Sequence, residues 1–344
     1  MKLSFEKITQ ITKGVSYITE EKDGVQFHRF NEFEEKYYSN SPWPRQYSTS
    51  GVKLAFLTDS TTMMLKVNVK EATPTHYFSH DVFCDQKRIG SLRNFKDNDL
   101  PIKVDEKTLL PLGDFNLGVF KENFNLGKGM KEVTIVFPWS VNSCLEELIL
   151  DDGAKVLAVK NNYKMISFGD SITYGASTLY PSNRYAAKLS KDFGLEEICK
   201  AVGGEIFCPG LLGNEKEENV RCVTVAYGTN DLGKGWDDFQ NRSGEFFWKI
   251  TELYPEALIF AISPIWRKDC EGRDALYKID KIRNHIKAIA SQYNNIIFID
   301  GRDLVPNDSA FFADKVLHPS DEGMEYYYKG LKSIIQNLLR RCDK

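Results

Sequence analysis

The sequence lacks the features that define several large classes of protein. Its 344 residues contain no apolar run of membrane-spanning length, and its 45 Lys and Arg do not outnumber its 48 Asp and Glu. The formal net charge of −3 therefore gives no electrostatic case for nucleic acid, and the lack of a long apolar run gives none for a membrane. The seven cysteines include no Cys-x-x-Cys pair, so neither a zinc site nor a redox pair is predicted.

The amino terminus also lacks the apolar core of a signal peptide, because the segment 1–7 becomes polar at once. Widely scattered cysteines of odd number suit reduced thiols. We therefore expect a cytoplasmic protein. With 42% hydrophobic and 27% charged residues, the chain is typical of globular proteins, and its length allows two domains.

The first part of the chain has the period of two that marks half-buried antiparallel strands. Apolar residues alternate with polar or small ones at Val52, Leu54, Phe56, Leu65, Val67 and Val69. Further strands are expected at 77–84 and 132–137, whereas 91–125 has the composition of loops and strand ends. Several short strands without helical periodicity predict a β-sandwich or jelly roll, which we assign to residues 1–155.

From about Asn161 the pattern changes. Apolar strand candidates at 163–168, 220–227, 257–262 and 295–299 alternate with helical stretches. Two helices have apolar stripes, one formed by Ile279, Ile282, Ile286 and Ile289 and the other by Leu331, Ile334, Ile335 and Leu338. This alternation predicts a doubly wound parallel sheet over 156–344, with the boundary between the domains near Asp151.

An apolar run from Ile166 ends abruptly in Gly169-Asp170-Ser171. Such a change is typical of a strand that passes into a helix, and α/β sheets place ligands at the carboxyl ends of their strands. A serine there lies beside unpaired N–H groups and the positive end of the helix dipole, which stabilise an alkoxide or oxyanion. The simpler alternative is that Asp170 or Ser171 only caps the helix.

A serine nucleophile needs a base, and only His285 and His318 lie in the second half. His285 falls within a regular helix and suits a surface or interface role. His318 precedes Pro319, which disfavours a helical conformation at the histidine and places it on a loop before the last helix. From there it can reach the edge of the sheet that holds Ser171, although a loop histidine often has no role.

Two segments supply candidate oxyanion donors. Asn230, in Gly-Thr-Asn-Asp after an apolar strand, offers a side-chain amide. Gly204, in Gly-Gly after another short apolar segment, would let a backbone N–H approach a substrate closely. Both segments also fit simple turns, because Gly, Asn and Asp are ordinary turn formers.

The order of these pieces resembles the SGNH, or GDSL-type, hydrolases, over roughly residues 161–344. The resemblance implies a flavodoxin-like hydrolase fold, with Ser171 as nucleophile and His318 as general base. It also implies an oxyanion hole made of the Ser171 and Gly204 N–H groups and the Asn230 amide. The first half resembles the jelly-roll domain that precedes the catalytic domain in certain bacterial carbohydrate esterases.

The chain departs from the family pattern in two places. The family usually has an aspartate three residues before the histidine, where this chain has Lys315, and Asp314 lies four before. Two ways of orienting His318 are therefore open: Asp314 completes a triad, or a backbone carbonyl orients the histidine of a dyad. Cys199 stands where the family often has asparagine.

The resemblance implies ester hydrolysis through an acyl-enzyme and favours O-deacetylation of a carbohydrate. No metal or organic cofactor is expected, because no motif of the sequence resembles a metal-ligand or dinucleotide-binding motif. A lysophospholipase or acyl-thioesterase is one alternative, and a non-catalytic glycan-binding protein on the same scaffold is another. The expected partner is an acetylated sugar or oligosaccharide rather than nucleic acid or a membrane. The β domain has three roles open to it: sugar binding, support of its neighbour, or the interface of a homo-oligomer.

Overall fold

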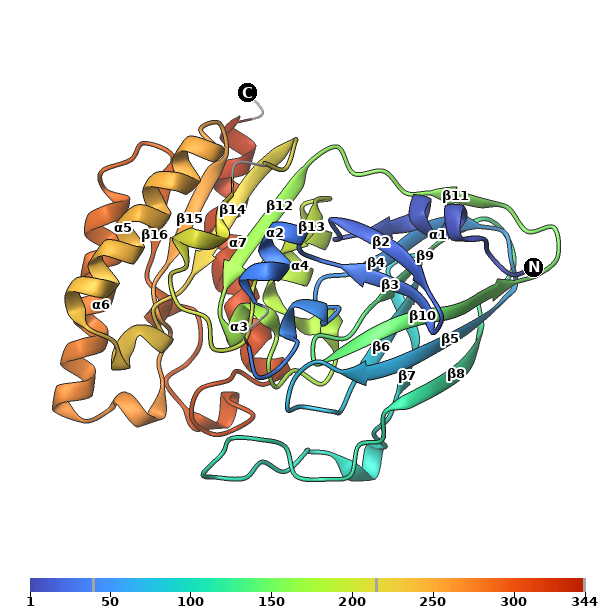
Figure 1. Cartoon of the computed structure of the whole chain (residues 1–344), viewed down its shortest axis with the longest axis horizontal. Helices are drawn as coiled ribbons and strands as arrows, with labels where there is room; N and C mark the ends of the chain where they lie inside the picture. Colours follow the sequence, from blue (N-terminus) through green and yellow to red (C-terminus); the bar gives the residue numbers. More distant parts are fainter. Residues whose placement is uncertain (39–40, 214–215, 343–344) are drawn as a thin grey trace. The chain divides into compact units, whose positions relative to one another are not determined.

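The computed structural model describes residues 1–38, 41–213 and 216–342 (Figure 1). Contacts divide the chain into two compact units, Met1–Asn161 with Leu179–Ser182, and Asn162–Thr178 with Asn183–Lys344. The sequence predicts a division at 155/156, whereas the first unit continues to Asn161, because strand β11 (Val156–Ala158) pairs with β4 (Lys53–Thr58). Among the described residues, no helix has both the length and the apolar character that crossing a membrane requires.

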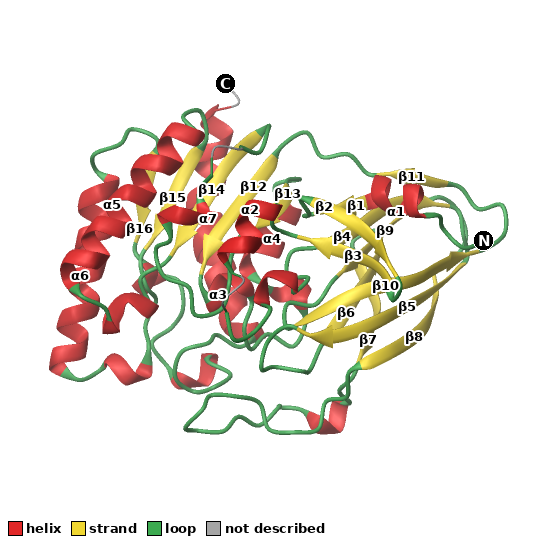
Figure 2. Cartoon of the chain, in the orientation of Figure 1, coloured by secondary structure: helices red, strands yellow, loops and turns green. Residues whose placement is uncertain are grey.

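The first unit consists of two antiparallel sheets (Figure 2). One has the order β1-β4-β9-β6-β7, with β11 also on β4, and the other β2-β3-β10-β5-β8. The remaining strands of the first sheet are β1 (Thr12–Lys13), β9 (Lys131–Val136), β6 (Ser79–Cys84) and β7 (Lys87–Arg93). Those of the second are β2 (Tyr17–Glu21), β3 (Gly24–His28), β10 (Val141–Leu150), β5 (Thr62–Glu71) and β8 (Gly118–Asn125). Two short helices complete the unit, α1 (Phe5–Ile11) and α2 (Glu32–Tyr37).

The alternation of apolar and polar residues along β4 and β5 determines which face of each strand is buried. On β4, Leu54 and Phe56 are fully buried, and on β5 the inward residues Met63, Leu65, Val67 and Val69 are at most 1% exposed. Burial of each such side chain contributes about 1.5–3 kcal/mol. A shift of one residue would turn all of them to solvent, so this pattern also specifies the register. The predicted β-sandwich is confirmed.

One prediction for this unit was wrong. The segment 91–125, which we expected to hold loops and strand ends, contains the whole of β8, which pairs with β5 from Thr62↔Asn125 to Val69↔Gly118. β8 is an edge strand, and most of its residues other than Phe124 are exposed or half-buried. It therefore shows little of the apolar alternation by which half-buried strands are found.

The segment Leu179–Ser182 belongs to the first unit, although its neighbours in the chain belong to the second. Asp81, fully buried on β6, accepts hydrogen bonds from the Ser182 N–H at 3.1 Å and the Ser182 hydroxyl at 2.6 Å. Arg93 Nη1 donates to the Tyr180 hydroxyl at 2.9 Å. Because a buried carboxylate is costly without donors, these bonds tie the segment to β6 and β7.

The second unit is a parallel sheet with helices around it. Its strand order is β13-β12-β14-β15-β16, so the chain starts in the interior of the sheet and then extends it on either side. The strands are β12 (Lys164–Gly169), β13 (Glu196–Cys199), β14 (Val220–Ala226), β15 (Leu258–Ile262) and β16 (Ile296–Ile299). The helices are α3 (Ser171–Tyr174), α4 (Tyr185–Asp192), α5 (Trp236–Leu253), α6 (Arg273–Ala290) and α7 (Asp321–Cys342). This is the flavodoxin-like order, whose switch point lies between β12 and β14.

The buried residues of α6 are those of its predicted apolar stripe, whereas those of α7 match its predicted stripe only in part. All four predicted isoleucines of α6 are buried. In α7, Leu331 and Ile335 are fully buried but Ile334 is 36% exposed. The buried stripe there contains Tyr327, Leu331, Ile335 and Leu339, an i, i+4 row that lines up on one side of a helix.

Candidate active site

The candidate residues follow the carboxyl ends of neighbouring strands. Ser171 comes two residues after β12 ends at Gly169, and Asn230 follows the end of β14 at Ala226. Gly169 and Ala226 are opposite each other in the sheet. Both segments therefore leave the sheet at its switch point, where α/β folds of this kind bind ligands.

Ser171 is the first residue of the short helix α3, and Asp170 is its N-cap. The Asp170 Oδ1 accepts a hydrogen bond from the Ile172 N–H at 2.9 Å. A side chain at Gly169 would collide with Thr173 on α3 and would also press against the Ala226 carbonyl, so glycine lets α3 begin directly after β12. Ser171 itself is 9% exposed. Asp170 therefore caps the helix, as the simpler alternative proposed, and Ser171 remains available beside it.

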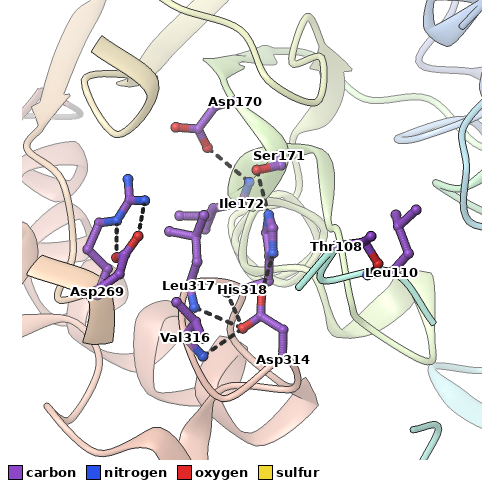
Figure 3. A network of polar contacts seen from close by, with 11 residues as sticks. Thr108, Leu110, Asp170, Ser171, Ile172, Asp269, Asp314, Val316, Leu317 and His318 are labelled. Atoms are coloured by element: carbon purple, nitrogen blue, oxygen red, sulfur yellow. Dashed lines mark hydrogen bonds and ion pairs between the residues drawn. The ribbon is translucent and has the colours of Figure 1, made fainter. Parts of the chain in front are cut away.

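His318 contacts both Ser171 and Asp314 (Figure 3). Its Nε2 lies 2.8 Å from the Ser171 Oγ, and its Nδ1 lies 2.6 Å from the Asp314 Oδ2. An ionised carboxylate only accepts hydrogen bonds. With Asp314 ionised, Nδ1 therefore donates to it and Nε2 is the acceptor of the Ser171 proton.

The loop before α7 explains how a four-residue spacing allows this contact. Asp314 Oδ1 accepts hydrogen bonds from the N–H groups of Val316, Leu317 and His318 at 2.9, 2.8 and 3.1 Å. Lys315 has a φ of +63°, in the left-handed region, which bends the chain around the carboxylate. The bend takes up the one residue by which the Asp314–His318 spacing exceeds the usual three, and the Asp314 carboxylate still reaches Nδ1 of His318.

The same contacts determine the charge of Asp314. Its side chain is fully buried, which by itself raises a carboxyl pKa. The hydrogen bond and charge of His318 and the backbone donors of Leu317 and Val316 outweigh this effect, and the pKa of Asp314 is lowered. The group therefore stays ionised over the neutral range, as an acceptor for the Nδ1 proton requires.

The segment after β13, which includes Gly204, contacts both the end of β12 and the turn that contains Asn230. The Val202 N–H donates to the Gly169 carbonyl at 3.2 Å, and Asn230 Nδ2 donates to the Glu205 carbonyl at 2.9 Å. Asn230 thus keeps one of its two amide protons for another acceptor. Gly204 has a φ of +81° and is exposed. Within the described chain, the N–H groups of Ser171 and Gly204 make no hydrogen bond.

Two arginines that sequence reasoning missed hold the turn that contains Asn230. Arg242, on α5, forms an ion pair with buried Asp231 at 2.9 Å and also donates to the Phe207 carbonyl at 3.0 Å. It therefore joins the turn after β14 to the segment that includes Gly204. Burial, only partly offset by Arg242, raises the pKa of Asp231.

Arg267 holds the same turn from the segment that follows β15. Its Nη1 donates to the Thr229 carbonyl at 2.9 Å, and its Nε and Nη2 bind the two oxygens of Asp269, each at 2.7 Å. The next residue, Lys268, donates its N–H to the Val316 carbonyl at 2.9 Å, in the loop before His318. The segment after β15 therefore connects the Asn230 turn with the histidine loop. Nothing local in the sequence marks either arginine as a support of this turn, because the turn lies on a different element from both of them.

The other histidine of the second half, His285, has a different environment. It lies against the rings of Trp236 and Phe239, and its Nε2 is 3.1 Å from the Ser243 hydroxyl. No cluster of three or more His, Cys, Asp and Glu side chains suited to a metal ion occurs in the part of the chain that the structure describes.

A doubly wound sheet with a serine, a histidine and a carboxylate in contact at its carboxyl edge defines the class of the α/β serine hydrolases. Residues 167–326 match the model of the GDSL-like lipase/acylhydrolase family, so the second unit contains a domain of that family. No curated protein matches the chain in sequence.

Solved structures share the fold of the whole chain at low identity. A salicylyl-acyltransferase, SsfX3, from a tetracycline biosynthetic pathway is 18% identical, with a TM-score of 0.79 and coverage of 98% of this chain and 97% of its own. A family two carbohydrate esterase from Clostridium thermocellum is 15% identical, with a TM-score of 0.63 and coverage of 91% and 98%. An acetyl xylan esterase (Est2A) from Butyrivibrio proteoclasticus is 14% identical, with a TM-score of 0.59 and coverage of 98% of both chains. The order of a β-sandwich followed by a hydrolase domain is thus a shared architecture.

Proposed function

We propose that the protein is a serine esterase that removes O-acetyl groups from a small carbohydrate through a covalent acyl-enzyme. The observation that carries the proposal is the chain of contacts from the Ser171 Oγ through His318 to Asp314, at 2.8 and 2.6 Å. A nucleophile within hydrogen-bond reach of a base, with the base oriented by a third group, is the arrangement that acyl transfer requires.

In the first half of the reaction, His318 Nε2 takes the proton of Ser171 as Oγ attacks the carbonyl carbon of the ester. The carbonyl oxygen becomes negatively charged, and the free N–H groups of Ser171 and Gly204 and the second amide proton of Asn230 are the donors available to it. The tetrahedral intermediate then collapses. His318 gives its proton to the leaving alcohol, and the acetyl group remains on Oγ.

In the second half, water repeats these steps on the acyl-enzyme. His318 takes a proton from water, the resulting hydroxide attacks the acetyl carbonyl, and the proton returns to Ser171 as acetate leaves. Asp314 supports both halves because it holds Nδ1 as a donor and stabilises the imidazolium that forms twice in each turnover. An ionised Asp314 with a lowered pKa suits this role at neutral pH.

Removal of the Asn230 amide should show how much the oxyanion donors contribute. We expect Asn230→Ala to lower kcat by about 10²–10³-fold, the usual effect of losing one such donor, with a smaller change in KM. Asn307→Ala, a substitution of the same type in a different loop of the second unit, is the control and should leave kcat unchanged. Equal kcat values for the Asn230 variant and the wild type would contradict the assignment of this donor.

The carbohydrate part of the proposal is supported by architecture. Two of the similar structures are carbohydrate esterases by their names, and both share the β-sandwich as well as the hydrolase domain. The acyltransferase named above has the same two-domain fold. The experiment must therefore detect transfer of the acyl group to an alcohol instead of to water.

The experiment compares acetylated mono- and oligosaccharides with the 4-nitrophenyl esters of acetate, butyrate and octanoate, with Ser171→Ala as the control. We expect release of free acetate from at least one sugar acetate, preference for acetate among the 4-nitrophenyl esters, and loss of both activities in the variant. Activity that rises with chain length would favour a lipid or thioester substrate. Consumption of ester without free acid would indicate transfer to another alcohol, and no serine-dependent activity on any ester would favour a glycan-binding protein.

A further inference from the structure

Asp170 has a carboxylate oxygen that the fold does not use. The residue is 2% exposed and lies next to the nucleophile in the chain. Its Oδ1 caps α3 through the Ile172 N–H, whereas its Oδ2 has no hydrogen-bond partner among the described residues. Burial raises the pKa of Asp170 to about 7, against the opposing effects of the Ile172 N–H and of the charge of His318. A carboxylate oxygen that has no partner in the protein needs a donor from water or from a ligand.

Arg267 has unused donors in the same region. A guanidinium offers five N–H groups, and the bonds to Asp269 and to the Thr229 carbonyl use three of them. One proton on Nη1 and one on Nη2 have no acceptor in the described chain. The side chain is 14% exposed and therefore not closed off from solvent completely.

The two side chains act on each other electrostatically. Burial is the largest influence on the pKa of both groups, and Asp269 is the largest charged one on Arg267; as smaller effects, the charge of Arg267 lowers the pKa of Asp170 and the charge of Asp170 raises the pKa of Arg267. Asp170 follows β12 and the Thr229 carbonyl follows β14, which is the adjacent strand. In Figure 3, Asp170 and Asp269, the partner of Arg267, lie on the same side of the Ser171–His318 pair. No direct bond joins Asp170 to Arg267 among the described residues.

We propose that Asp170 and Arg267 together bind a hydroxyl group of the substrate next to the ester that Ser171 attacks. The hydroxyl donates to Asp170 Oδ2 and accepts from a free N–H of Arg267, which matches the donor and acceptor character of an alcohol. This inference rests on the proposed function and deepens it, because it selects substrates with a hydroxyl near the ester, as in partly acetylated sugars. An apolar group in the same place would leave both protein groups without partners, which sites of this kind reject strongly.

The test uses the ratio of kcat/KM for a partly acetylated sugar to kcat/KM for 4-nitrophenyl acetate, which has no hydroxyl. Asp170→Asn keeps an acceptor for the Ile172 N–H, since asparagine is also a good N-cap, but replaces Oδ2 by a donor. We expect this ratio to fall by at least about tenfold in Asp170→Asn and in Arg267→Gln, a modest part of the discrimination that sites built for a hydroxyl achieve. Arg302→Gln is the matched control, because Arg302 binds Asp300 through two nitrogens as Arg267 binds Asp269, and it should not change the ratio.

Three results of this measurement would contradict the proposals. Equal losses on both substrates would overturn the inference and leave Asp170 and Arg267 as supports of α3 and of the Asn230 turn. An unchanged ratio in both variants would overturn it as well. Wild-type protein that hydrolyses 4-nitrophenyl acetate through Ser171 but no sugar acetate would instead contradict the carbohydrate part of the proposed function, before the variants are compared.

Discussion

Ser171→Ala should lower kcat for ester hydrolysis on the order of 10⁶-fold, and His318→Ala should have a similar effect. The two groups act as one unit, because the oxygen of Ser171 is a weak nucleophile until the Nε2 of His318, 2.8 Å away, accepts its proton. The double variant should therefore be hardly less active than either single one. The measurement is steady-state hydrolysis of the best acetyl ester, with melting temperatures to show that the variants are folded.

His285→Ala is the matched control for this prediction. His285 lies in the same unit but contacts Ser243 and two aromatic rings, so its removal should leave kcat within a few-fold of the wild type. A Ser171→Ala variant that retained more than about one hundredth of the wild-type kcat would rule out Ser171 as the nucleophile, given the size of effect expected for a covalent mechanism.

Asp314→Asn should lower kcat by about 10⁴-fold, the effect of the same change in a Ser-His-Asp triad. The asparagine oxygen can still accept the backbone N–H bonds from Val316 and Leu317, so the loop should keep its shape. Its amide nitrogen, however, would face His318 Nδ1 as a donor. The imidazole would then carry its proton on Nε2, where it cannot take the proton of Ser171.

The control for this prediction is Asp308→Asn, which changes an aspartate that only caps a short helix by accepting from the Ala310 N–H. It should be without effect on kcat. A loss of less than tenfold in Asp314→Asn would favour the dyad, in which a backbone carbonyl orients His318. Asp314→Ala should in addition lower the melting temperature, because three N–H groups, one buried and two partly buried, would lose their acceptor.

The strands that surround the site were predictable because burial on both faces leaves continuous apolar runs. β14, β15 and β16 fall within the ranges read from the sequence, and β12 exceeds its range only by Gly169. β8 was not predicted, since an edge strand that exposes most of its side chains has no apolar pattern to recognise. In α7, the fully buried residue beside Leu331 and Ile335 is Tyr327, whereas Ile334 faces solvent, because the neighbours against which a helix packs decide which of its apolar residues are covered.

By itself, the sequence determined the two kinds of domain and the residue types at the ends of the strands. Ser171, Asn230 and His318 could be named because each stands at a change from a regular pattern to a turn. Only the tertiary structure decided that Asp314 reaches His318, because the bend at Lys315 compensates for the unusual spacing. It alone placed Arg242 and Arg267 on the Asn230 turn and left an oxygen of Asp170 without a partner. These features depend on burial and on contacts between distant elements, such as the 147 residues that separate Ser171 from His318, and no local pattern of side chains encodes them.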